Sequence, residues 1–102
     1  MKVEIFFFEG CPNHKPAADR VLGIIREERI SANVTEIEVP DEAAAKKFGF
    51  LGSPTIRVNG VDIEPASRTA TGVGFACRCY AGGLPGVDMI RAALREAEGH
   101  GS

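Results

Sequence analysis

FFFEGCPNHKPAADRVL, residues 6–22, connects a predicted strand to a predicted helix through a turn that contains a cysteine. Residues 2–8 are rich in strand formers and apolar on both faces toward their end, which is typical of a buried central strand. From about Pro16 the apolar spacing becomes helical. The apolar positions recur at i, i+3, i+4 and i+7 as Ala18, Val21, Leu22 and Ile25. The stretch therefore predicts a strand, a tight turn at Cys11 and an amphipathic helix.

Two further predicted elements follow this helix. Residues 33–39 alternate in polarity like a second strand, and Pro40 ends them. Asp41 is a suitable N-cap for a short helix that reaches Lys47. Because a helical crossover separates the first two strands, we expect these strands to be parallel.

A hairpin and a last helix complete the predicted fold. Asn59-Gly60 is a strong two-residue turn signal between the strands Thr55–Val58 and Val61–Ile63. Val87–Ala97 has the spacing of a closing amphipathic helix. The order β-α-β-α-β-β-α predicts an α/β fold in which helices flank a mixed four-stranded sheet.

The composition is that of one globular domain. The chain has 102 residues, of which 44% are hydrophobic and 25% charged, with a formal net charge of -2. We expect a single domain over residues 1–98, with residues 99–102 as a flexible tail or a cloning remnant. The interspersed charges predict neither a nucleic-acid nor a membrane partner, and no apolar run approaches the roughly 20 residues of a membrane span. Because Met1-Lys2 leads directly into a strand, a cytoplasmic location is expected.

The three cysteines are Cys11, Cys77 and Cys79. The latter two fall in residues 65–86, which lack a helical pattern and are long for a loop inside a compact domain. Residues 73–80 alternate, which predicts an additional edge strand with both cysteines on one face. In a reducing compartment, thiols of this kind are more often catalytic or metal-binding than structural.

Three features resemble the thioredoxin-like superfamily, and in particular small bacterial thioredoxin-family proteins of this length, some of them grouped with alkylmercury lyases. Cys11 follows the first strand, where the family keeps its nucleophile, and Ser53-Pro54-Thr55 is similar to the family's cis-proline segment. The hairpin and terminal helix complete the likeness, which covers residues 2–63 and 87–97. The resemblance implies that Ser53, Pro54 and Thr55 face Cys11 and bind substrate. The motif departs from the family, because C-P-N-H replaces C-x-x-C.

Cys11 is placed for thiolate chemistry. Backbone N–H groups and the dipole at a helix N-terminus stabilise a thiolate, and the donors here would come from Asn13, His14 or Lys15. Protonated His14 or Lys15 could add to this effect, and His14 could instead exchange a proton with a leaving thiol. The structural alternatives are a small buried Cys11, a solvated His14 and an ordinary trans Pro54.

Cys77 and Cys79 could act in several ways. In an extended strand their Cα atoms would lie roughly 6.6 Å apart, so a disulfide between them is not expected. Either thiol could resolve a mixed disulfide at Cys11, or all three thiols could gather around a soft metal ion. They could equally be packing residues.

The sequence thus predicts a thiol–disulfide oxidoreductase with Cys11 as nucleophile, acting on a protein or small-molecule disulfide or thiol. Cys77, Cys79 or an external thiol would resolve the mixed disulfide, and no cofactor is expected. One alternative is a protein that binds mercury or copper(I) through its cysteines. Another is a non-catalytic interaction module on the same fold.

Overall fold

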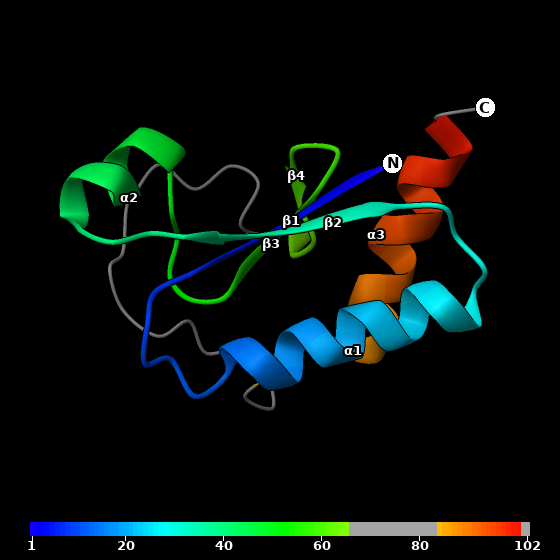
Figure 1. Cartoon of the computed structure of the whole chain (residues 1–102). Coiled ribbons are helices and arrows are strands. Elements are labelled where there is room, and N and C mark those ends of the chain that lie inside the picture. Colours follow the sequence, from blue (N-terminus) through cyan, green and yellow to red (C-terminus); the bar gives the residue numbers. More distant parts are fainter. Residues whose placement is uncertain (66–83, 101–102) are drawn as a thin grey trace.

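A computed structural model describes residues 1–65 and 84–100 (Figure 1). The elements are β1 (Lys2–Phe7), α1 (His14–Glu27), β2 (Asn33–Glu38), α2 (Glu42–Phe48), β3 (Thr55–Val58), β4 (Val61–Asp62) and α3 (Val87–His100). This order confirms the predicted α/β fold. The additional edge strand predicted for residues 73–80 lies outside the described residues, as do Cys77 and Cys79.

The sheet is mixed and four-stranded, with the order β2-β1-β3-β4. β1 pairs in parallel with β2, from Lys2 opposite Asn33 to Phe7 opposite Glu38, and in antiparallel with β3. β3 and β4 form the predicted hairpin. β1 is thus a central strand, as its continuous apolar sequence indicated.

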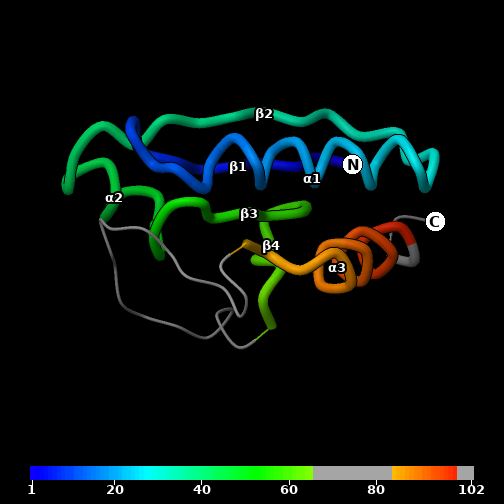
Figure 2. Tube along the Cα trace, turned by 90° about the horizontal axis from the view of Figure 1, so that it is seen from below, coloured from blue at the N-terminus to red at the C-terminus, as the bar shows by residue number. Residues whose placement is uncertain are grey.

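Helices cover both faces of the sheet. α1 and α3 lie together on one face (Figure 2), where they enclose the larger core cluster, which includes Val3 and Ile5 of β1. α2 covers the other face, where Phe6, Ala45 and Phe50 belong to a smaller cluster. The alternation along β1 follows from the two-residue period of a strand, which directs consecutive side chains to opposite faces.

α1 begins two residues before Pro16 and buries a different stripe from the predicted one. Its first helical residue is His14, and its buried side chains are Ala17, Ala18, Val21 and Ile24. Leu22, predicted to lie in the core, is 40% exposed, and Ile25 is only partly buried. The i, i+3, i+4 rule fits two overlapping sets of positions in this helix, and packing against the sheet and α3 selects the set centred on Val21.

Gly23 occupies the middle of α1, on an exposed part of the helix. A Cβ added there would meet no atom within 4 Å, and the residue has ordinary helical geometry. We therefore expect Gly23→Ala to raise the free energy of unfolding by about 0.5–1 kcal/mol, because alanine loses less backbone entropy on folding. Urea denaturation measures this change, and a destabilised variant would contradict it.

α2 is capped at both ends by the residues that its sequence indicates. The side chain of Asp41 accepts a hydrogen bond of 2.8 Å from the N–H of Ala44, which confirms the predicted N-cap. Gly49 ends the helix in the left-handed region, with φ of 64°. The chain then turns toward β3 through residues 50–54.

Arg57 of β3 holds the end of α2 against the sheet. Its Nη2 donates a hydrogen bond of 2.9 Å to the carbonyl oxygen of Gly49, and its guanidinium lies 4.7 Å from the centre of the Phe6 ring. These contacts position the segment between α2 and β3.

No helix among the described residues is long and apolar enough to cross a membrane.

Candidate functional site

Cys11 lies in a tight turn between β1 and α1. Its backbone N–H donates to the carbonyl oxygen of Phe8 at 3.3 Å, and its own carbonyl oxygen accepts from the N–H of His14 at 3.4 Å. Gly10, immediately before it, has φ of +90°, a conformation that residues with a Cβ rarely adopt. The turn leaves Cys11 buried, at 9% of its full exposure.

The segment before β3 meets this turn at Ser53. The Cys11 thiol lies 3.5 Å from the carbonyl oxygen of Ser53 and donates to it. The hydroxyl oxygen of Ser53 accepts from the N–H of Phe8 at 3.3 Å. Ser53 therefore joins the end of β1 to the cysteine turn, and its backbone carbonyl oxygen accepts a hydrogen bond from the thiol.

Pro54 and Thr55 complete this segment. The Ser53–Pro54 peptide bond is cis, as the resemblance implied. The hydroxyl of Thr55 donates to the carbonyl oxygen of Gly52 at 2.5 Å. Gly52, Ser53, Pro54 and Thr55 are all buried. The structure thus brings the predicted substrate-binding segment and the predicted nucleophile together.

His14 is directed elsewhere. Its Nε2 lies 2.5 Å from Oε1 of Glu36 in β2, and its ring stacks on Phe7 with centroids 3.7 Å apart and planes 6° apart. β2 is the neighbour of β1 on one side. β3, which begins two residues after Ser53, is its neighbour on the other side. The imidazole and the Cys11 thiol are therefore held from opposite sides of β1. The contacts found for the imidazole do not pair it with the sulfur.

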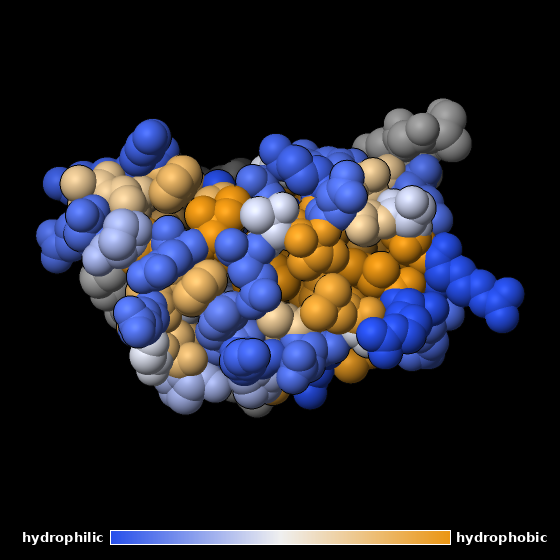
Figure 3. All heavy atoms as spheres, in the orientation of Figure 1, coloured by the Kyte–Doolittle hydropathy of each residue, from blue (hydrophilic) through white to orange (hydrophobic). Residues whose placement is uncertain are grey.

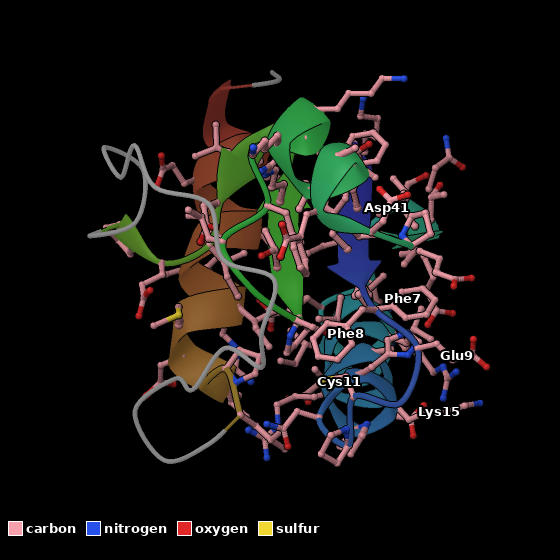
Figure 4. All side chains as sticks on the ribbon, turned by 90° about the vertical axis from the view of Figure 1, so that its left-hand side faces the viewer. Phe7, Phe8, Glu9, Cys11, Lys15 and Asp41 are labelled. Carbon is pink, nitrogen blue, oxygen red and sulfur yellow. The ribbon has the colours of Figure 1, made fainter. Side chains whose placement is uncertain are left out.

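The sequence reasoning did not identify three residues of this end of the sheet, namely Phe7, Phe8 and Glu36. Figure 4 shows Phe7 and Phe8 with Cys11 where β1 ends. Phe8 contributes its N–H to Ser53 and packs beside the smaller core cluster. The sequence predicted a strand at residues 33–39, and Glu36 lies within it. Its contact with His14, however, depends on the register between β1 and β2, which no local pattern reveals.

The other predicted thiols fall outside this site as far as it is described. Cys77 and Cys79, to which the resolving role and the shared metal site were assigned, lie outside the described residues. Within residues 1–65 and 84–100, no three His, Cys, Asp or Glu side chains gather as a metal site would require.

Comparison with known proteins does not assign the chain to a family. A scan against models of protein families found no match, and a search of curated proteins also found none.

Proposed function

We propose that this protein is a thioredoxin-like thiol–disulfide oxidoreductase in which Cys11 is the attacking nucleophile. The observation that carries the proposal is the position of Cys11 in the turn before α1, beside the segment Ser53-Pro54-Thr55. A cysteine that served only as a small packing residue would not need this position, where a helix N-terminus can stabilise a thiolate. The element order and the segment Ser53-Pro54-Thr55 support the family resemblance.

The first step is attack on a substrate disulfide. The Cys11 thiolate forms a bond to one substrate sulfur, and the substrate S–S bond breaks. The electron pair of that bond leaves with the second substrate sulfur as a thiolate, which then takes a proton from water. The product is a mixed disulfide between Cys11 and the substrate.

A second thiolate completes the reduction. It attacks the Cys11 sulfur, forms a new disulfide with it and releases the remaining substrate sulfur as a thiolate. The substrate gains two electrons and the pair of protein or external thiols loses them. Because C-P-N-H supplies no second cysteine, this thiolate comes from Cys77, Cys79 or a small external thiol.

Mass mapping of thiols after mild oxidation tests the second step. If a cysteine of the chain resolves the mixed disulfide, we expect a peptide in which Cys11 is bridged to Cys77 or Cys79. A matched pair of variants, Cys77→Ser and Cys79→Ser, identifies which bridge forms and should trap the mixed disulfide when the resolving thiol is lost.

Three other outcomes separate the alternatives. Adducts of Cys11 with glutathione, without an internal bridge, support an external resolving thiol. An unmodified Cys11 under conditions that oxidise a model thiol would contradict the proposal. Tight binding of one equivalent of mercury or copper(I), lost in each cysteine variant and accompanied by no disulfide reduction, would replace it with the metal-binding alternative.

A further inference from the structure

Among the strands of residues 1–65, β2 forms one edge of the sheet. Within the described residues, this strand pairs with β1 alone, and its register continues without a bulge from Asn33 to Glu38. The other edge strand, β4, has only two residues, whereas β2 has six. β2 also lacks proline and lysine, the residues that most often protect a strand edge.

The hydrogen bonds of β2 determine which backbone groups face outward. The N–H of Asn33 donates to the carbonyl oxygen of Met1, and the N–H of Val39 donates to the carbonyl oxygen of Phe7. Because backbone groups alternate in direction along a strand, the odd-numbered residues of β2 face β1. Val34, Glu36 and Glu38 therefore direct their N–H and C=O groups away from the sheet.

The side chains along this edge change in character from one end to the other. At the start of β2, Val34 is partly buried and packs against the larger core cluster, as does Ile25 of α1, whereas Leu22 of α1 is 40% exposed. Figure 3 shows the hydrophobic surface that gathers between α1 and β2. Toward the end of β2, Glu38 is exposed and the side chain of Glu36 remains 47% exposed despite its contact with His14.

We propose that the β2 edge binds an extended segment of another protein, one that has basic residues at one end and apolar residues at the other. Such a segment would add a strand to the sheet through the outward groups of Val34, Glu36 and Glu38. Its basic side chains would lie opposite the two glutamates. Its apolar side chains would cover Val34 and the hydrophobic surface between α1 and β2 (Figure 3). The inference goes beyond the thiol chemistry and does not depend on it.

Charge argues against a second copy of this chain as the occupant. In a parallel pair of β2 strands, Glu36 and Glu38 would face the same residues of the other copy, and like charges directly opposite are destabilising. In an antiparallel pair, the acidic end of each strand would face the apolar end of the other. The same glutamates that oppose self-association favour a basic partner.

A synthetic peptide tests this surface. Acetylated and amidated Lys-Thr-Lys-Thr-Val-Thr-Val matches an antiparallel added strand, and the reversed sequence matches a parallel one. With one of the two bound, we expect hydrogen exchange to slow at the amides of Val34, Glu36 and Glu38. The amides of Thr35 and Ile37, which already face β1, should change little. The same peptide with Glu in place of Lys should bind more weakly.

Variants of Glu38 separate charge from backbone pairing. Glu38→Ala removes the carboxylate and keeps the N–H, so we expect binding of the Lys peptide to weaken about two- to five-fold. Glu38→Pro also removes the outward N–H, which an edge strand tolerates, and should weaken binding at least about ten-fold. Glu38→Lys should reverse the preference and favour the Glu peptide.

Three results would overturn the inference. The first is unchanged hydrogen exchange of β2 at millimolar concentrations of both peptide orientations. The second is equal binding of the Lys and Glu peptides by the natural chain. The third is a dimer in sedimentation experiments that is lost in Glu38→Pro, because the edge would then be an interface between copies of this chain.

Discussion

Cys11→Ser is expected to reduce a model disulfide no faster than the external reductant does alone. A serine hydroxyl is not ionised near neutral pH and does not attack disulfides, so the variant lacks the nucleophile on which both steps depend. The serine hydroxyl is smaller than the thiol and is likewise a hydrogen-bond donor, so the substitution introduces neither a clash nor a charge beside the Ser53 carbonyl oxygen. Steady-state turnover of a chromogenic disulfide, with glutathione as the reductant, measures this loss.

A double variant, Cys77→Ser together with Cys79→Ser, is the matched control. It keeps Cys11 and changes two other thiols, so glutathione should still sustain turnover if Cys11 is the attacking group. Thermal unfolding should show that both proteins remain folded. Turnover that is unchanged in Cys11→Ser would contradict the proposed function, since no other cysteine occupies the turn before α1.

Phe50→Ala is expected to lower the free energy of unfolding by about 3–5 kcal/mol. Phe50 is completely buried in the cluster between the sheet and α2, where Phe6 and Val39 are its buried neighbours. Removing the ring forfeits its transfer from water and leaves a cavity that close-packed neighbours fill only in part. For a small domain, this loss is a large fraction of the total stability of about 5–15 kcal/mol.

Urea denaturation followed by circular dichroism measures the effect as a shift in midpoint at constant slope. Phe48→Ala is the matched control, because Phe48 belongs to the same cluster but is only partly buried. We expect a smaller loss for Phe48→Ala than for Phe50→Ala. Equal losses would show that burial of the ring at position 50 does not account for its contribution.

Most of the fold could be predicted from local signals. Asn59-Gly60 specified the hairpin, and Asp41 specified the start of α2, because each acts on backbone groups within a few residues. The apolar residues toward the end of β1 indicated a central strand, because a strand that is buried on both faces carries apolar side chains on both. The buried stripe of α1 was predicted less well. Leu22 fits the helical period, but its exposure depends on where the sheet and α3 meet the helix.

The sequence likewise predicted one part of the candidate site and not the rest. The place of Cys11 after β1 and before α1 follows from the order of strand, turn and helix. The family resemblance, rather than any local pattern, pointed to Ser53 as its neighbour. Nothing in C-P-N-H shows that His14 pairs with Glu36 instead of the thiol, since an imidazole three residues from a cysteine can turn to either side of β1.

The amino-acid sequence by itself determined the elements and their order, because periodicity, helix caps and turn residues act on neighbouring residues in the chain. Only the tertiary structure decided which side chains meet. Ser53 reaches Cys11 across 42 residues and Glu36 reaches His14 across 22. The outward direction of Glu38 depends likewise on the register of β2 against β1. These contacts require a choice of register and face that is made only when the sheet and its helices pack together.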